Sequence, residues 1–431
     1  MQTQATYGEF SARIHKSSHG TGNGRIPVEA SIEVTRRCPL ECLHCYNNLP
    51  MNDRAARSEE LTLEEHRRLL DELAEAGCLW LLYTGGEVFA RADFPEIYRS
   101  AKAKGFLITI FTNGTLITPR VADMLAEWRP FGIEITLYGA TRETYEALTQ
   151  IPGSYERCMR GVRLLVERGL PLKLKTVPTT VNLHEVYAMK RFAEEDLGVE
   201  FKFDPLVNPR IDCSASPLGV RLSPEEVVAL DFHDAQREGE YRRMATAEAS
   251  MDRGMNVEAG HVYFCGGGMT SLAVDPAGRM SICVLSQRET YDWRRGSLRD
   301  AWENFFPRVR LKPKTRPTKC DACRIQSLCG MCPANGELEN GDPEEPVEFL
   351  CQVAHLRAEA LGLAVPEHGA CAFCTTGARH AEVARAAARI RQREINVGEW
   401  TPRLPALPIL GSSGAAGGCG SGHCGSCVAH S

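Results

Sequence analysis

The sequence has 431 residues, which is enough for two or three domains and a substantial core. Its 50 Lys and Arg residues against 55 Asp and Glu residues give a formal net charge of −5, so neither a nucleic-acid partner nor a membrane surface is indicated. No apolar run reaches the ~18 residues of a membrane span, and residues 1–30 lack the apolar stretch of a signal peptide. We therefore expect a cytoplasmic protein, in which 18 cysteines indicate metal binding or catalysis rather than disulfides.

Short apolar runs alternate with helical periodicity through the first half of the chain. Six of these runs are predicted as strands, at 29–34, 79–84, 107–112, 132–137, 172–177 and 200–203. Capping-box patterns beginning at Thr62 and Ser223 predict the starts of two helices. Strands that alternate with helices predict an α/β fold with a parallel sheet, here a partial (β/α)6 TIM-type barrel. Chemistry in such a fold lies at the carboxyl ends of the strands.

The second half of the chain changes character several times. Turns and cysteines dominate from about residue 262, with short strands predicted at 271–274 and 280–284 and a helix at 379–395. Residues 404–431 contain no Lys, Arg, Asp or Glu and are rich in Gly and Ser, which predicts a mobile tail. The predicted organisation is an N-terminal extension (1–26), a barrel (27–230), a connector that begins within a polar helix at 224–238 (231–261), a cysteine-rich domain (262–365), and a helix followed by the tail (366–431).

A cysteine triplet directly follows the first predicted strand. Cys38, Cys42 and Cys45 have the spacing Cys-x3-Cys-x2-Cys, which allows three thiolates to bind one [4Fe–4S] cluster and leaves one iron open to a substrate or cofactor. The alternative on spacing alone is a zinc site that takes His44 as a fourth ligand.

Residues 27–230 resemble the radical S-adenosylmethionine (SAM) enzymes, whose signature is this triplet with an aromatic residue before the last cysteine. His44 occupies that position here, a departure that leaves the iron ligands unaffected. The resemblance extends to Gly85, Gly86 and Glu87 after the second strand, whose backbone and carboxylate would meet the SAM amino group, and to Asn113 after the third. It further implies SAM contacts from Thr136 and Lys175, at the ends of the fourth and fifth strands.

The resemblance also implies the chemistry. A reduced [4Fe–4S] cluster would cleave SAM to methionine and a 5′-deoxyadenosyl radical, which would abstract hydrogen from a substrate. An electron donor such as a flavodoxin or ferredoxin would supply the reducing electron. The barrel would position the substrate C–H bond and exclude solvent. No general acid or base is assigned.

A second group of cysteines predicts a small metal-stabilised domain, with two zinc ions as the alternative on spacing alone. Its seven members are Cys265, Cys283, Cys320, Cys323, Cys329, Cys332 and Cys351. The segment resembles the SPASM domain, which carries auxiliary [4Fe–4S] clusters in peptide-modifying radical SAM enzymes. By that resemblance Cys320, Cys323, Cys329 and Cys351 would hold one cluster, and Cys265, Cys283 and Cys332 another whose fourth ligand is unassigned. Two residues rather than three separate Cys329 from Cys332, which makes Cys332 the least secure ligand.

The remaining cysteines of interest follow this domain. They are Cys371 and Cys374, and then Cys419, Cys424 and Cys427, with His423 among the last three. Three interpretations compete: a further metal site, a redox or metal-delivery arm, and a fused peptide substrate. An inert solvated tail is a fourth.

The family resemblance favours modification of a ribosomally made peptide or protein, which the tail itself could supply, with leader recognition by a separate protein. Modification of a small molecule, such as a tetrapyrrole precursor, is the alternative within the same chemistry. A non-catalytic iron–sulfur or metal-binding protein is the alternative outside it. Neither a nucleic acid nor a membrane is expected as a partner.

Overall fold

The computed structural model describes residues 25–246 and 260–398. Most of the predicted N-terminal extension and the cysteines at 419, 424 and 427 therefore lie outside the described residues. No helix in the described part is both long and apolar enough to cross a membrane.

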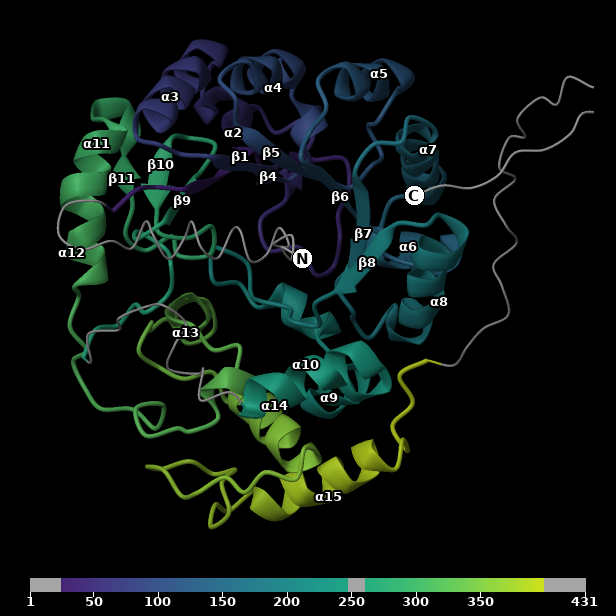
Figure 1. Ribbon diagram of the computed structural model, residues 1–431, viewed down its shortest axis with the longest axis vertical. Helices are drawn as coiled ribbons and strands as arrows, with labels where there is room; N and C mark the ends of the chain where they lie inside the picture. The colour runs from purple at the N-terminus through teal and green to yellow at the C-terminus, as the bar shows by residue number, and fades with distance from the viewer. Residues whose placement is uncertain (1–24, 247–259, 399–431) are drawn as a thin grey trace, which may run out of the picture.

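A curved sheet of parallel strands organises the first half of the chain (Figure 1). Its strands are β1 (Glu29–Thr35), β4 (Trp80–Gly85), β5 (Leu107–Thr112), β6 (Gly132–Thr136), β7 (Leu172–Thr176) and β8 (Glu200–Phe203), and they neighbour one another in that order. Each pairs with the next in parallel. The predicted partial (β/α)6 barrel is confirmed.

Helices cover the outer side of this sheet (Figure 1). They are α3 (Leu63–Glu75), α4 (Phe94–Ala103), α5 (Pro119–Glu127), α6 (Arg142–Thr149), α7 (Ser154–Glu167) and α8 (Val186–Arg191). The capping box at Thr62 is formed, since its hydroxyl accepts from the Glu65 N–H while the Glu65 carboxylate accepts from the Thr62 N–H. In β6, buried Ile133 and Ile135 alternate with Glu134 and Thr136, so one face of the strand is apolar and the other polar.

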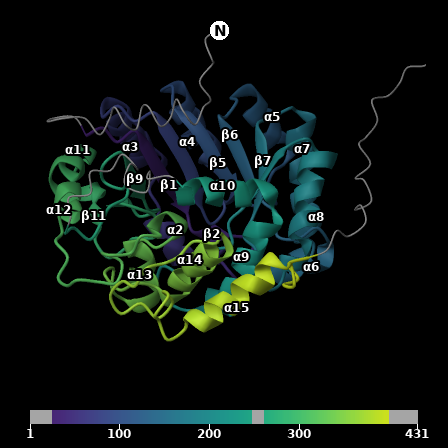
Figure 2. The same cartoon turned by 60° about the horizontal axis from the view of Figure 1, so that its bottom comes forward.

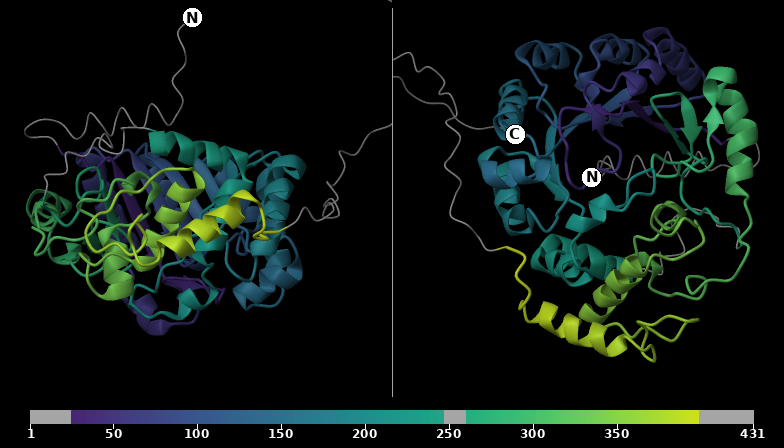
Figure 3. Two further views of the ribbon diagram at one scale, coloured as in Figure 1. Left: turned by 90° about the horizontal axis from the view of Figure 1, so that it is seen from below. Right: turned by 180° about the vertical axis from the view of Figure 1, so that it is seen from behind.

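The cysteine-rich half of the chain extends the same sheet. Strand β9 (Ser271–Val274) pairs in parallel with β1, and β10 (Arg279–Ser281) and β11 (Tyr291–Asp292) follow it in antiparallel order. The sheet thus has nine strands in the order β11-β10-β9-β1-β4-β5-β6-β7-β8. Figure 3 shows β9–β11 together with α11 (Leu298–Asp300) and α12 (Phe306–Arg310) beyond the β1 edge. The division into barrel and cysteine-rich domain stays a prediction, but the two share backbone hydrogen bonds.

A group of helices packs together in the C-terminal part of the fold (Figure 2). It comprises α9 (Pro224–His233), α10 (Ala235–Thr246), α14 (Glu348–Ala360) and α15 (His380–Arg391), and α13 (Pro333–Asn340) precedes α14 in the chain. Two helices separated at Asp234 replace the single polar helix expected at 224–238, and residues 227–232 are buried. Residues of α9 are buried because both α14 and α15 pack against this helix, a tertiary contact that the local sequence does not show.

Candidate functional site

The cysteine triplet lies in the loop that leaves strand β1. Cys38 ends the short strand β2 (Arg37–Cys38), which pairs with β3 (Leu49–Pro50), and a short helix α2 (Arg54–Glu59) follows. The Cys45 N–H donates to the Cys42 carbonyl at 3.0 Å and turns the loop back on itself. Burial raises the pKa of the Cys42 thiol, and the thiols of Cys45 and Cys38 raise it further, so the structure brings all three thiols together.

The Gly85–Gly86–Glu87 segment lies directly against the strand that leads to the triplet. The Gly86 N–H donates to the Thr35 carbonyl at 2.8 Å, and the Glu87 N–H donates to the Arg37 carbonyl at 3.0 Å. Gly85 has φ of +126°, and a Cβ there would lie 2.1 Å from the Thr35 oxygen. Only glycine allows this approach, so the two glycines serve to bring the end of β4 against the start of the cysteine loop.

Glu87 connects the end of β4 to the end of the next strand, β5. Its buried carboxylate accepts hydrogen bonds from the Thr112 hydroxyl at 2.8 Å, the Asn113 N–H at 2.8 Å and the Phe89 N–H at 3.2 Å. The Asn113 amide in turn donates from Nδ2 to the Cys38 Sγ at 3.4 Å. Burial raises the pKa of Glu87 to about 6 despite these donors. The predicted residues Cys38, Glu87 and Asn113 therefore form one connected unit.

Thr136 and Lys175 are adjacent across strands β6 and β7, as their positions at successive strand ends predict. The Lys175 ammonium donates to Glu134 Oε2 at 3.1 Å and lies 2.9 Å from the centre of the Phe111 ring. Burial lowers the pKa of Lys175 to about 8, although Glu134 opposes the shift. Lys202 donates to the other Glu134 oxygen at 2.8 Å. Within the described residues, no hydrogen bond or ion pair joins this charged cluster to the triplet.

Two side chains that the sequence did not single out contact the cysteine loop. Arg210, from the segment between β8 and α9, donates to the Cys45 carbonyl at 3.2 Å and to the Asn48 carbonyl at 2.8 Å. A hydrogen bond from Tyr138, just after β6, opposes the increase in the pKa of the Cys42 thiol. Both come from distant parts of the chain without a motif, so no sequence pattern marked them.

His44 behaves as an aromatic packing residue. Its ring lies 5.4 Å from that of Tyr138, and burial lowers the pKa of His44 to about 4, so the ring is neutral. The departure from the usual aromatic residue at this position is thus compatible with the family's packing.

The seven later cysteines influence one another's pKa values in two groups, and their assignment to two clusters stays a prediction. Burial raises the pKa values of Cys283 and Cys332. The thiols of Cys332 and Cys265 raise the pKa of Cys283 further, and Cys265 also raises that of Cys332. In the second set, burial raises the pKa of Cys329 to about 11 with contributions from Cys320 and Cys323, and that of Cys351 to about 12 with contributions from Cys329 and Cys320. The short spacing before Cys332 does not keep it from its predicted neighbours.

The thiol groups do not have the spacing of a single bound ion. Four ligands around one zinc at 2.3 Å place the sulfurs about 3.8 Å apart. Within residues 25–246 and 260–398, one group of three or more His, Cys, Asp or Glu residues has its ligand atoms all within 4.8 Å of one another, namely His355, His368 and Cys371. Neither the triplet nor the two later thiol sets therefore have the spacing of ligands around a single ion. Backbone N–H groups donate to two of the sulfurs, from Leu285 to Cys283 at 3.5 Å and from Met331 to Cys329 at 3.4 Å. Such hydrogen bonds are among those that tune Fe–S clusters.

Comparison with known proteins agrees with this geometry. Residues 32–193 match the Radical SAM superfamily. The chain is 27% identical to an AdoMet-dependent heme synthase of Methanosarcina barkeri, over 73% of this chain and 94% of the relative. It is 24% identical to the antilisterial bacteriocin subtilosin biosynthesis protein AlbA of Bacillus subtilis, over 76% of this chain and 72% of the relative.

A solved structure shows the same fold. The chain superimposes on Streptococcus suis SuiB bound to the precursor peptide SuiA with a TM-score of 0.58 and 18% identity, over 82% of each chain. The family match, the fold and the cysteine-rich region after the barrel lead to one conclusion. The chain is a radical SAM enzyme of the SPASM type, which uses S-adenosylmethionine and [4Fe–4S] chemistry.

Proposed function

We propose that Cys38, Cys42 and Cys45 hold the catalytic [4Fe–4S] cluster. The connected unit of Cys38, Asn113 and Glu87 carries this assignment, because it joins the thiols to the strand ends where SAM would bind. The bound cofactors supply one-electron cleavage of SAM and hydrogen abstraction from the substrate.

The residues around the cluster act by positioning. Gly85 and Gly86 let the backbone after β4 reach the cysteine loop, where it faces SAM. Glu87 holds the Asn113 backbone and fixes the amide against the Cys38 sulfur. Because its carboxylate already accepts three hydrogen bonds, we assign Glu87 to orienting this loop as well as to SAM binding. Thr136 and Lys175 are proposed as further SAM contacts.

We propose auxiliary clusters at the two later thiol sets. Cys320, Cys323, Cys329 and Cys351 would hold one of them, and Cys265, Cys283 and Cys332 the other. Arg310 of α12 hydrogen-bonds Cys265, so a guanidinium stands beside the set that has only three thiols. That cation would stabilise negative charge on a cluster or on a substrate group there.

For the substrate we propose a peptide or protein. The similarity to AlbA, whose name places it in the biosynthesis of a bacteriocin, covers 76% of this chain, so it reaches into the cysteine-rich half and supports this choice. The C-terminal tail is one candidate substrate, and leader recognition would fall to a separate protein. A flavodoxin or ferredoxin would supply the electron.

One observation favours a tetrapyrrole instead. The relatives named AdoMet-dependent heme synthase align along 85–94% of their own length, at 24–27% identity. This full-length match makes radical modification of a tetrapyrrole precursor the second candidate function.

One experiment separates the two substrates. The full-length protein, reconstituted anaerobically with iron and sulfide, receives SAM and dithionite with or without Fe-coproporphyrin III and is then digested with trypsin. Peptide modification predicts 5′-deoxyadenosine together with an altered mass of the 404–431 fragment or of an added candidate peptide, neither of which a Cys42→Ala variant should produce. A new tetrapyrrole mass with all peptides unchanged would establish the second candidate and contradict the first.

A further inference from the structure

A second, chemically different site lies between α14 and α15. The segment 364–379 contains neither helix nor strand, yet it buries His368, Cys371, Phe373 and Cys374 to exposures of 6%, 5%, 1% and 1%. Loops longer than about 12–15 residues with no secondary structure of their own are uncommon and are usually functional when they are ordered. The sequence had left Cys371 and Cys374 open between a metal site and other roles.

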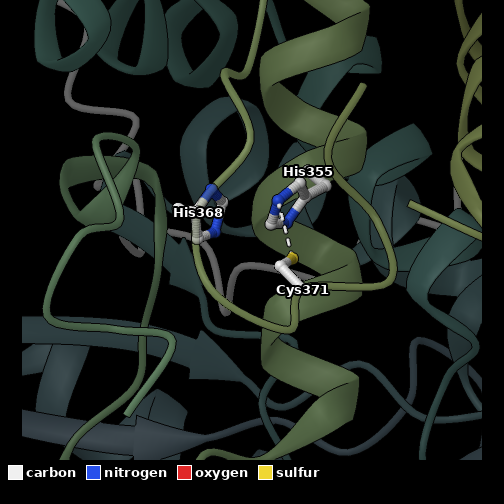
Figure 4. Close-up of side chains that lie close together, drawn as sticks. All are labelled: His355, His368 and Cys371. Carbon is white, nitrogen blue, oxygen red and sulfur yellow. Dashed lines mark hydrogen bonds between the residues drawn. The ribbon is translucent and has the colours of Figure 1, made fainter. Parts of the chain in front are cut away.

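Three potential ligand atoms converge in this segment (Figure 4). His355 on α14, His368 and Cys371 each offer one atom, and all three atoms lie within 4.8 Å of one another. The Cys371 Sγ is 3.4 Å from the His355 Nε2, and the two imidazole rings stack with centroids 5.6 Å apart. This spacing suits one ion, in contrast to the wider thiol sets described above.

Both histidines are oriented as metal ligands usually are. The His355 Nδ1 lies 2.7 Å from the Cys351 carbonyl, and the His368 Nδ1 lies 2.9 Å from the Pro366 carbonyl. A carbonyl can only accept, so each Nδ1 carries the proton and each Nε2 keeps its lone pair. Metal-bound histidines characteristically donate their other ring N–H to a carbonyl or carboxylate in this way.

The backbone around the two cysteines is tightly turned. The Cys371 N–H donates to the His368 carbonyl at 3.3 Å, and the Gly377 N–H donates to the Cys374 carbonyl at 2.7 Å. Cys374 is buried three residues from Cys371, and its Sγ donates to the Cys371 carbonyl at 3.3 Å. Rotation about its Cα–Cβ bond would release that contact, and Cys371 and Cys374 have the Cys-x2-Cys spacing found in zinc sites.

We propose that His355, His368, Cys371 and Cys374 form a structural zinc site. Because all four side chains are nine-tenths or more buried, the site is closed, as tetrahedral structural zinc sites are. Zinc binding displaces the two thiol protons and leaves both imidazoles neutral, so two protons are released for each ion bound. The ion would fasten the 364–379 segment to α14, and the proposal does not depend on the substrate.

A rival use of Cys371 is ligation of the neighbouring iron–sulfur cluster. The Cys371 thiol contributes to raising the pKa of Cys323, and α14 carries both His355 and the proposed cluster ligand Cys351. The two sites are therefore neighbours, and the test must count zinc and iron separately.

The experiment uses the full-length chain with Cys419, Cys424 and Cys427 changed to Ser, so that tail thiols contribute no metal. The protein is reconstituted with iron and sulfide, given zinc, desalted, and measured for both metals by mass spectrometry. We expect about one zinc per chain. X-ray absorption spectra at the zinc edge should show two sulfur and two nitrogen ligands. His368→Gln and Cys371→Ser should each lower zinc content at least tenfold and leave iron unchanged, whereas His184→Gln, at an exposed histidine, should change neither.

Cobalt provides a second readout that does not rely on the variants. Titration of the same protein with Co²⁺ should give the visible bands of a tetrahedral site with two thiolates. Zinc content that persists in both ligand variants would overturn the proposal. Iron content that falls with Cys371→Ser would assign that thiol to the cluster and also overturn it, and a sulfur count of one would overturn the role of Cys374.

Discussion

The hydrogen bonds of Glu87 connect the ends of two strands to a sulfur. Its carboxylate has two oxygens and accepts from three donors, whereas a Gln amide would keep one oxygen and present an NH2 group to the others. Glu87→Gln should therefore displace Asn113 from Cys38. We expect 5′-deoxyadenosine formation to fall about 10- to 100-fold, with a higher KM for SAM.

Glu185→Gln is the matched control for this change. Glu185 is also buried and accepts from the Ala140 and Thr141 N–H groups, in a different loop. It should lower the unfolding temperature without raising the KM for SAM. Equal KM values for Glu87→Gln and the wild type would contradict the positioning role.

His66 on α3 is a buried histidine whose ring nitrogens have no hydrogen-bond partner within the described residues. Burial lowers the pKa of His66 to about 3, with a further decrease from Arg91. The folded state keeps the ring neutral while the unfolded chain binds a proton below pH 6.5, so stability is lost as the pH falls. Between pH 7.5 and 5.5 this amounts to about 1.4 kcal/mol.

His66→Leu should remove this part of the pH dependence. Denaturant unfolding of the variant and the wild type at both pH values gives the difference directly. If acidification destabilises both proteins equally, the assignment of a low pKa to His66 is wrong.

The sequence predicted site residues where they form a contiguous motif at a strand end. Cys38, Glu87 and Asn113 each follow a predicted strand, and parallel strands end at one edge of a sheet. Arg210 and Tyr138 could not be found in this way, because each reaches the loop from a remote segment that has no motif of its own.

At the level of elements, the alternation of short apolar runs with helical periodicity, together with the capping patterns, predicted the positions of the strands well. The strands at 107–112, 200–203 and 271–274 have the predicted bounds, and the others differ by one to three residues at an end. Helix α9 shows the limit of such signals. Its polar positions are few and its buried ones face α14 and α15, helices whose placement no local pattern reveals.

The close approach of the β4 end to the chain after β1 admits no side chain at Gly86. A Cβ there would lie 2.4 Å from the Arg36 carbonyl oxygen and 2.6 Å from that of Arg37, and both are backbone atoms that cannot swing aside. Gly86→Ala should destabilise the protein by about 1–3 kcal/mol and reduce the iron retained by the triplet. Thermal unfolding and iron analysis measure both effects.

Gly219→Ala is the control, because a Cβ at Gly219 meets nothing within 4 Å and its φ is not positive. It should leave stability and iron content nearly unchanged. Wild-type stability in Gly86→Ala would contradict the close packing described between Gly86 and the chain after β1.

At the level of the whole molecule, a buried ion network holds α14 against the helices after the barrel. Asp231 of α9 is fully buried and accepts from Arg357 of α14 at 2.8 and 2.9 Å, and from Arg237 of α10 at 2.6 Å. Asp231→Asn removes the anion that pairs with the buried Arg357 guanidinium and with the partly buried Arg237, so we expect about 3–5 kcal/mol of destabilisation.

The exposed pair of Glu225 and Arg389, at 3.3 Å, is the comparison. Glu225→Gln should cost less than about 1 kcal/mol, because solvent screens that pair. Chemical unfolding of both variants measures the contrast, and equal losses would show that the buried network does not anchor α14. Sequence reasoning could not have predicted this network, which joins residues 126 positions apart.

We propose that the triplet, and not the later thiol sets, carries the cluster that cleaves SAM. The most direct measurement is 5′-deoxyadenosine formed by reconstituted wild type, Cys42→Ala and Cys323→Ala, with exposed Cys213→Ser as the control. We predict no cleavage in Cys42→Ala, partial cleavage without product in Cys323→Ala, and wild-type cleavage in Cys213→Ser. Full cleavage of SAM in Cys42→Ala would contradict the assignment of the catalytic cluster to the triplet.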